Sequence, residues 1–293
     1  MPLINLTNNT ISTQKAVSSN KVDCHVHLFD PARFPYQKST QYSPQGHELA
    51  TREQLFQLLE NYQVNYALLV APNSAYATDN TCMLDAIAHY PHRLKGIAVV
   101  ENDISENELL TLKKAGVVGI AFNATFYGTE YYAHTHSLLA LLHQLNMCVQ
   151  VQVEGEQLDD LLPLLLSSPV TVVIDHCGRP VPRKGVAQPG MKALKQLADT
   201  KRAFIKLSGY AKFSSEFPPY QDVHKYIRAI VDTFTPEHCM WASDWPFLRA
   251  NHRIDYGVML SIVDQVLTDP HEKNQILYST ANSLFGFSHE EFY

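Results

Sequence analysis

The sequence predicts an α/β protein that forms a single (β/α)8 barrel, and three observations support this prediction. The chain has 293 residues, which is close to the roughly 250 residues of a typical barrel of this kind. Eight short apolar runs alternate with eight longer amphipathic segments, as parallel strands joined by helices do. Hydrophobic residues make up 45% of the chain and charged residues 18%, so one large core can be filled.

The expected strands are short, rich in β-branched residues and almost continuously apolar, which is typical of strands buried on both faces. They cover residues 22–27, 66–70, 94–100, 117–122, 147–153, 170–176, 203–208 and 239–244. An open doubly wound sheet is the alternative. Such a sheet normally carries a glycine-rich phosphate turn after its first strand, whereas residues 28–31 here read Leu-Phe-Asp-Pro, so the closed barrel is favoured.

The expected helices show apolar residues at helical spacing, and the first of them opens with Thr51, a residue suited to cap a helix. They lie near residues 51–60, 79–90, 105–115, 134–145, 157–167, 190–199, 220–234 and 256–267. A final helix near 270–279 and the closing segment 281–287 are expected to pack across the barrel. The loop 31–46 follows the first strand, so it is expected to lie over the mouth, where barrel active sites form.

No boundary divides residues 21–293, so we expect one hydrolase-sized domain preceded by a flexible tail, residues 1–20, rich in Ser, Thr and Asn. The tail lacks the apolar core of a signal peptide, and no run reaches the roughly 20 apolar residues of a membrane span. Five scattered cysteines suit buried thiols in a reducing compartment. We therefore expect a cytoplasmic protein that does not bind membranes. A net charge of −6 without a basic block argues against nucleic acid as a partner.

Polar residues with reactive side chains close three of the expected strands. His25 and His27 alternate along the first strand, so both imidazoles point to one face. His176 closes the sixth strand and Asp244 closes the eighth. The pair of histidines, taken alone, is better explained by solvent exposure or by partners in the core than by function. The convergence of three strand ends favours a reaction centre, since barrel enzymes draw catalytic residues from several strands.

These motifs together resemble the amidohydrolase superfamily, and most closely the branch of 2-pyrone-4,6-dicarboxylate lactonase-like TIM-barrel hydrolases. The matching motifs are Asp-Cys-His-Val-His at 23–27, Phe-Asp-Pro at 29–31, Arg-Phe-Pro-Tyr at 33–36, Thr-Asp-Asn at 78–80, Asp-His-Cys-Gly-Arg-Pro at 175–180, Lys-Leu-Ser-Gly at 206–209 and Ser-Asp-Trp-Pro at 243–246. The resemblance covers residues 21–287. Each motif is weak alone, and the set is specific.

The resemblance implies an enzyme that opens a small lactone, a cyclic carboxylic ester, in the breakdown of aromatic compounds or sugar lactones. Asp244 matches the carboxylate that activates water as a general base. His25, His27 and His176 match the residues that polarise the carbonyl and stabilise the oxyanion, and such a set suffices for ester hydrolysis. The alternatives are a metal-dependent non-oxidative decarboxylase of the same superfamily and an inactive barrel that serves as a binding module.

The expected metal content follows from what the fourth and fifth strands lack. Binuclear members of the superfamily carry a bridging lysine or glutamate on strand four and a histidine on strand five. Here strand four runs into Ala-Phe-Asn at 121–123, and strand five carries Gln150 and Gln152 on one face instead of a histidine, which argues against two metals. One zinc ion held by His25, His27 and Asp244, with or without His176, satisfies the ligand count. The lactonase branch implies that no cofactor is required, so we expect at most one divalent ion.

The expected substrate differs from the dicarboxylate of the namesake. Lactonases of that kind carry arginines on strand four, where this chain has Val118 and Ala121. Arg179 and Lys212 then form a binding site for one anionic group. Two carboxylates are not expected, because lysine does not reproduce the bidentate grip of arginine on a carboxylate. We therefore expect a small-molecule lactone with one anionic group, such as a sugar lactone or a muconolactone-like ring. Further candidates for the pocket wall are Gln150, Gln152, Asn123, Tyr76 and Tyr210. The sequence leaves the oligomeric state open, a homo-oligomer included.

Overall fold

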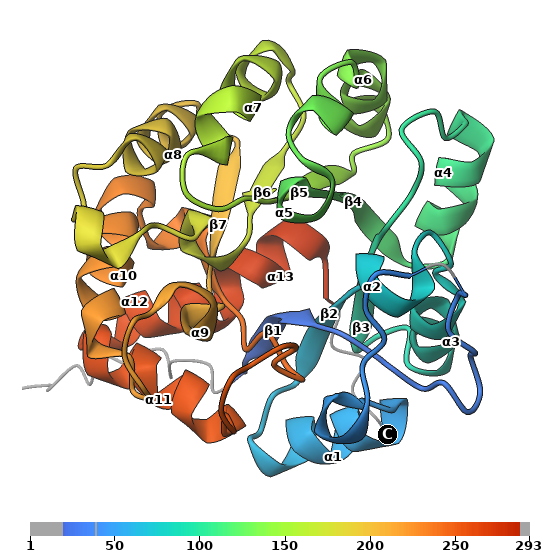
Figure 1. Cartoon of the computed structure of the whole chain (residues 1–293), viewed down its shortest axis with the longest axis horizontal. Coiled ribbons are helices and arrows are strands. Elements are labelled where there is room, and N and C mark those ends of the chain that lie inside the picture. The colour runs from blue at the N-terminus through green and yellow to red at the C-terminus, as the bar shows by residue number, and fades with distance from the viewer. Residues whose placement is uncertain (1–19, 39, 288–293) are drawn as a thin grey trace, which may run out of the picture.

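The predicted barrel is confirmed by a computed structural model, which describes residues 20–38 and 40–287. Eight parallel strands follow one another in chain order around the barrel (Figure 1). They are β1 (Val22–Val26), β2 (Tyr66–Val70), β3 (Leu94–Ala98), β4 (Val117–Asn123), β5 (Cys148–Gln152), β6 (Val172–Ile174), β7 (Ala203–Leu207) and β8 (Cys239–Trp241). A parallel bridge between Val26 and Trp245 joins the last strand to the first. Its hydrogen bond runs from the His27 amide to the Trp245 carbonyl at 2.9 Å.

Eight long helices form the outer ring in Figure 1, and each begins and ends within two residues of its expected bounds. They are α1 (Arg52–Asn61), α3 (Thr81–His89), α4 (Glu106–Lys114), α6 (His136–Gln144), α7 (Gln157–Ser167), α8 (Pro189–Asp199), α10 (Gln221–Phe234) and α11 (Tyr256–Val266). A capping box between Thr51 and Gln54 starts α1, as the sequence indicates. Short helices α2 (Asn73–Tyr76), α5 (Ala124–Tyr127) and α9 (Tyr210–Phe213) follow β2, β4 and β7 at the mouth.

The bottom of the barrel is closed by the C-terminal segment. The expected helix near 270–279 is in fact longer and not uniform. It runs as α12 (Pro270–Asn274), a π-helical turn (Gln275–Ser279) and α13 (Thr280–Phe285), and α13 crosses the barrel axis in Figure 1. Ala281, Phe285 and Phe287 belong to one buried cluster with Val22 and Met240 of the strands. The reactive groups are therefore confined to the opposite end.

Six of the expected strands end one to three residues early, and β6 and β8 are the two whose expected last residue is His176 or Asp244. Strand β6 covers Val172–Ile174 instead of 170–176, and β8 covers Cys239–Trp241 instead of 239–244. The backbone leaves the extended region after each of them, because His176 has φ 52° and Asp244 has φ 66°. The expected bounds extended each strand to its reactive residue, whereas the ladder stops two residues before His176 and three before Asp244.

Three further expectations concern the cysteines, membrane-spanning segments and the N-terminal tail. All five cysteines are free and buried, as expected. Among the described residues, no helix is both long enough and apolar enough to span a bilayer. Residues 1–19 of the expected tail and the last six residues, 288–293, lie outside the described residues. The single-domain boundary at residue 21 stays a prediction.

Candidate active site

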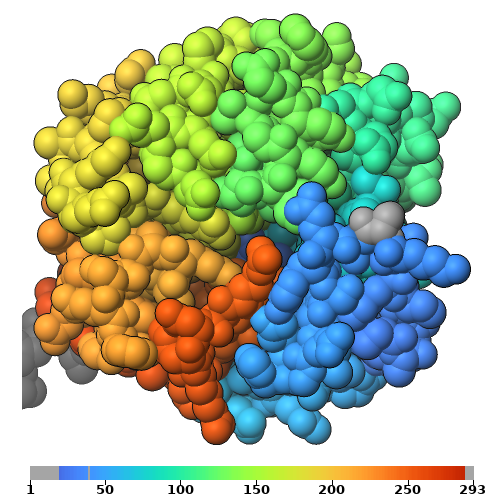
Figure 2. Space-filling view, in the orientation of Figure 1, coloured from blue at the N-terminus to red at the C-terminus, as the bar shows by residue number. Residues whose placement is uncertain are grey.

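The carboxyl ends of the strands surround a cavity of about 510 Å³. In the space-filling view it is a narrow hollow at the centre of the face, between the segments that follow β1 and β8 (Figure 2). Side chains from the ends of six strands line it, and Tyr42 of the 31–46 loop contributes to its rim. The cavity therefore lies where chemistry collects in barrels, and the loop lies over the mouth as expected.

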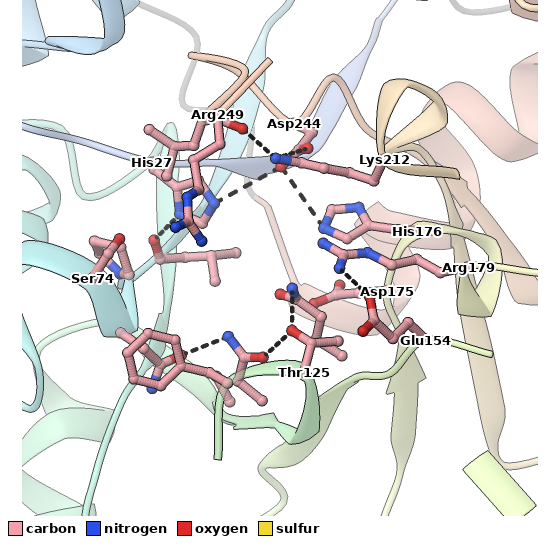
Figure 3. Close-up of a pocket in the computed structure, with 18 of the residues that line it drawn as sticks. His27, Ser74, Thr125, Glu154, Asp175, His176, Arg179, Lys212, Asp244 and Arg249 are labelled. Carbon is pink, nitrogen blue, oxygen red and sulfur yellow. Dashed lines mark hydrogen bonds and ion pairs between the residues drawn. The ribbon is translucent and has the colours of Figure 1, made fainter. Parts of the chain in front are cut away.

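The structure brings the four predicted centre residues together. The Nε2 atoms of His25 and His27 are 3.2 Å apart. The Oδ1 atom of Asp244 lies 3.9 Å from each of these Nε2 atoms and 3.7 Å from Nε2 of His176. His27, His176 and Asp244 face the cavity (Figure 3), whereas His25 is 1% exposed and lies beneath them. One carboxylate oxygen therefore faces three imidazole nitrogens.

A left-handed turn places two of the cavity side chains. His176, Cys177 and Arg179 have φ of 52°, 58° and 43°, and Gly178 between them has φ 69°. Each non-glycine residue in this region costs about 1–3 kcal/mol, and such costs concentrate at functional sites. The turn points both His176 and Arg179 into the cavity (Figure 3). Packing elsewhere in the barrel offsets the cost of this turn.

Gly209 supports His176 from behind and leads to a testable prediction. A Cβ atom at Gly209 would lie 2.5 Å from Cγ of His176, so Gly209→Ala must displace the imidazole. A shift of about 1 Å can cost roughly 100-fold in rate, and we expect a loss of that order. Gly185→Ala is the matched control, because Gly185 has φ 70° but open space around its Cβ position. Initial rates of both variants measure the effect on catalysis, and thermal unfolding checks that both are folded. Equal rates for Gly209→Ala and Gly185→Ala would contradict this role of Gly209.

Each imidazole of the centre has an oxygen atom close to its Nδ1 atom. His25 Nδ1 lies 3.2 Å from Oδ1 of Asp175. His27 Nδ1 donates to the Val70 carbonyl at 2.7 Å, and His176 Nδ1 lies 3.0 Å from Oγ of Ser208. These contacts fix the ring orientations and direct all three Nε2 atoms towards Asp244.

Beneath the imidazoles lies a buried polar cluster in which Gln150 was a predicted site residue, whereas Lys206 and Asp175 were not. Lys206 and Asp175 are 0% and 1% exposed, and they form an ion pair of 3.1 Å. Gln150 bridges them by donating to Asp175 at 2.8 Å and accepting from Lys206. The signal was present, because Lys206 stands in a strand that is otherwise buried on both faces, where a lysine needs a partner.

Burial determines the charge state of the imidazoles. Desolvation lowers the pKa of His25 and of His176 well below the usual range, and it also lowers the pKa of His27. The nearby Lys206 ammonium further lowers the pKa of His25. These rings are therefore neutral at pH 7, and each offers one N–H donor and one acceptor.

Three cations line the cavity, one more than expected. Arg179 and Lys212 face it as predicted, and Arg249 joins them from the segment after β8 (Figure 3). Lys212 donates to the Leu248 carbonyl and lies 4.0 Å from Oδ2 of Asp244. Burial lowers the pKa of its ammonium. The Nε atom of Arg179 is buried without a hydrogen-bond partner, so it remains available to an anion.

The wall of the cavity near β4 and β5 is polar, and its one acidic residue, Glu154, lies 3.5 Å from the guanidinium of Arg179. Asn123 and Gln152 line it as predicted, together with Asn73 and Thr125. Thr125 donates to Asn123 at 2.7 Å, Gln152 donates to Thr125 at 3.1 Å, and Asn123 donates to Asn73 at 3.0 Å. The Nδ2 atom of Asn73 is buried without a partner. This wall can therefore donate to hydroxyl or carbonyl oxygens of a ligand.

Two tyrosines that we expected in the pocket do not line it. The strand ends at Leu207 and α9 begins at Tyr210, so the alternation that would place Tyr210 beside Ser208 is lost. Tyr76 follows a kink at Ala75, where φ is 66°. Its hydroxyl accepts from the Asp30 amide at 3.0 Å, and its ring stacks on Phe29. Tyr76 therefore holds the segment after β1 instead of contacting a ligand.

The centre fits one divalent metal ion by its donor set. His25, His176 and Asp244 form the single such group of His, Cys, Asp and Glu ligands found within residues 20–38 and 40–287. In this group Oδ1 of Asp244 lies 3.9 Å from Nε2 of His25 and 3.7 Å from Nε2 of His176, and all three ligand atoms lie within 4.8 Å of one another. At the usual position of a second metal, β5 presents Gln150 and Gln152, as the sequence predicts, so the set suits one ion.

Comparisons with known proteins agree with this architecture. The sequence profile described as amidohydrolase matches residues 22–287. The 4-sulfomuconolactone hydrolase of Rhizobium radiobacter is 30% identical over 92% of this chain and 91% of that protein. The 2-pyrone-4,6-dicarboxylate hydrolase of Comamonas testosteroni is 26% identical over 94% of this chain and 93% of its own length.

A solved structure shows the same likeness in three dimensions. It is described as a 2-pyrone-4,6-dicarboxylic acid hydrolase from Acinetobacter baumannii with citric acid bound, and its sequence is 29% identical to this chain. The TM-score is 0.78, and the alignment covers 92% of this chain and 100% of that one.

Proposed function

The chain belongs to the amidohydrolase family, and from that premise we propose that it hydrolyses a small lactone at the centre formed by Asp244, His25, His27 and His176. The observation that carries this proposal is the convergence of one carboxylate oxygen and three imidazole nitrogens within 3.9 Å at the mouth of the barrel. The names of both relatives, each a hydrolase, support hydrolysis over the decarboxylase alternative. The neutral, buried imidazoles support a reacting centre over an inactive binding module.

In the proposed reaction, Asp244 takes a proton from a water molecule, whose oxygen attacks the lactone carbonyl carbon. Negative charge then develops on the carbonyl oxygen. The N–H group of His176 and the ammonium of Lys212 stabilise it, and preorganised donors of this kind are worth about 2.7–4 kcal/mol each. The ring C–O bond breaks, the alkoxide takes the proton from Asp244, and the product is an open hydroxy acid.

We propose a substrate with at least one anionic group, held by Arg179, Lys212 and Arg249. This extends the sequence-based expectation of a single anchor, because Arg249 adds a third cation to the cavity. Its guanidinium lies 4.8 Å from the ring centre of Tyr42, so the aromatic face orients it. The amide wall of Asn73, Asn123 and Gln152 suits the oxygen atoms at the other end of the lactone.

A panel of lactones tests the substrate class. Acid release is measured with a muconolactone that carries a carboxylate, sugar lactones, the pyrone dicarboxylate and an uncharged lactone. We expect turnover of singly charged lactones and weak turnover of the uncharged one. Efficient turnover of the pyrone dicarboxylate, with muconolactone and sugar lactones inert, would contradict the proposed substrate. No turnover of any lactone would contradict the function itself.

The cofactor requirement is a separate part of the proposal. We propose that hydrolysis needs no metal and that the centre holds at most one divalent ion, with His25, His27, His176 and Asp244 as ligands. A bound ion would polarise the carbonyl oxygen and acidify water. The proposed reaction does not depend on it, because Asp244 supplies the base, and His176 and Lys212 supply the donors.

Metal removal tests this part. After dialysis against a chelator and verification that zinc is absent, the rate of lactone hydrolysis should stay within about twofold of the untreated rate. The expectation rests on general base catalysis by Asp244. A loss of activity that zinc restores would contradict the metal-free reaction while leaving lactone hydrolysis in place.

We also propose a cytoplasmic location, which the five buried free thiols support.

A further inference from the structure

Lys206 occupies an unusual place inside the barrel, directly below the reaction centre. Its ammonium nitrogen lies 2.5 Å from Oε1 of Gln150, 3.1 Å from Oδ1 of Asp175 and 3.2 Å from Nδ1 of His25. An ammonium has three hydrogens and no lone pair, so it donates to all three atoms. Its contact with His25 therefore requires a lone pair on Nδ1.

The same Nδ1 atom also lies 3.2 Å from Oδ1 of Asp175, and the two neighbours make opposite demands. A carboxylate oxygen accepts, so it would favour a hydrogen on Nδ1. The Lys206 ammonium donates, so it favours a bare nitrogen. The carboxylate has other donors, since Gln150 and Lys206 both bind it. The ammonium would lose one of its three acceptors if His25 carried a hydrogen on Nδ1.

The other end of the chain of contacts agrees with a bare Nδ1 atom. His27 must carry its hydrogen on Nδ1, because the Val70 carbonyl 2.7 Å away can only accept. The Nε2 atom of a neutral His27 then holds a lone pair that faces Nε2 of His25 at 3.2 Å. His25 Nε2 must therefore carry the hydrogen between them. A doubly protonated His25 would place a second cation 3.2 Å from the Lys206 ammonium in a dry interior, which is costly.

We propose that Lys206 holds His25 in the tautomer with its hydrogen on Nε2, and that this tautomer weakens metal binding at the centre. Donors then run in one direction, from Lys206 to His25, from His25 to His27 and from His27 to Val70. A metal ligand needs the Nε2 lone pair, and the tautomer that offers it carries its hydrogen on Nδ1 and donates it to a carboxylate. Lys206 is thus a positioning residue that favours the metal-free centre.

The inference rests on the proposed centre and does not depend on which lactone is the substrate. It accounts for one feature that favours metal binding and one that disfavours it. The ligand atoms of His25, His176 and Asp244 lie within 4.8 Å of one another, and all three Nδ1 atoms have oxygen neighbours as they do in zinc sites. The sole extra neighbour is the Lys206 ammonium at His25, and it supplies a donor where a zinc site needs an acceptor.

The test reads the tautomer and the metal affinity directly. In wild-type protein labelled with ¹⁵N-histidine, with signals assigned through His25→Gln, we expect His25 to show a bare Nδ1 and a protonated Nε2. In Lys206→Met the hydrogen should move to Nδ1, where Asp175 accepts it. Binding of Zn²⁺ alone should then be about 10–100-fold tighter than in the wild type, the range typical of changes around a metal ligand.

Lys195→Met is the control, because Lys195 is exposed and pairs with Asp199 at 3.2 Å; its zinc affinity should equal that of the wild type. If Lys206→Met does not fold, the wild-type ¹⁵N spectrum alone tests the predicted tautomer of His25. A hydrogen on Nδ1 of wild-type His25, or equal zinc affinities for wild type and Lys206→Met, would overturn the proposal. A protein that is inactive on every lactone yet shows the expected spectrum would instead overturn the proposed function.

Discussion

Asp244→Asn is expected to reduce the rate of lactone hydrolysis by about 10²–10⁴-fold, the usual contribution of a general base. The amide matches the carboxylate in shape, but it cannot take a proton from water. The loss should appear in kcat, with KM nearly unchanged, because Arg179, Lys212 and Arg249 are left to bind the substrate. Rates measured under saturating substrate check this expectation.

The matched control is Asp199→Asn, an equal chemical change at an exposed residue of α8 that pairs with Lys195. This variant should hydrolyse lactones at the wild-type rate. Circular dichroism of both variants confirms that the fold is retained. An Asp244→Asn protein with wild-type kcat would overturn the assignment of the base and leave the remaining residues of the centre without a clear reaction.

Asp175→Asn is expected to lower the free energy of unfolding by about 3–5 kcal/mol, because it leaves the buried Lys206 ammonium without its counter-charge. The ion pair spans 3.1 Å between two residues that are 2% or less exposed. For a chain of this size the change corresponds to a fall in Tm of roughly 10 °C. Denaturant unfolding at pH 7 measures the difference.

Two variants make this second expectation specific. Asp199→Asn removes one partner of an exposed ion pair and should leave stability almost unchanged, because surface pairs contribute little. The double variant Asp175→Asn with Lys206→Met removes both buried charges, and it should recover much of the loss. A single Asp175→Asn variant as stable as the wild type would show that the buried pair does not hold this part of the barrel together.

The fold was predictable because its signal is distributed over the whole chain. Eight apolar runs and eight helical patterns specify the barrel even though individual ends are wrong by up to three residues, as at β8. The centre was predictable for a different reason. His25, His27, His176 and Asp244 follow strands directly, and parallel strands of a barrel deliver their ends to one rim.

The rest of the site depends on backbone geometry that hydrophobic periodicity and amino-acid composition do not encode. Arg249 lies in an irregular segment three residues after Pro246, where no hydrophobic periodicity indicates which way a side chain points. Tyr210 and Tyr76 were candidates for the pocket wall, and the chain turns away before either residue. Lys206 was visible within a matching motif, but its partners Asp175 and Gln150 come from two other strands. Such contacts arise only once the barrel has closed.

The central claim is that this chain adds water to a lactone, and hydrolysis in H₂¹⁸O tests it most directly. With a carboxylate-bearing lactone, mass spectrometry of the product should show an open hydroxy acid with one ¹⁸O atom in the newly formed carboxylate. The label should be absent from the same substrate incubated with Asp244→Asn for the same time. A product without ¹⁸O, whether an isomerised lactone or an acid that has lost CO₂, would contradict the account.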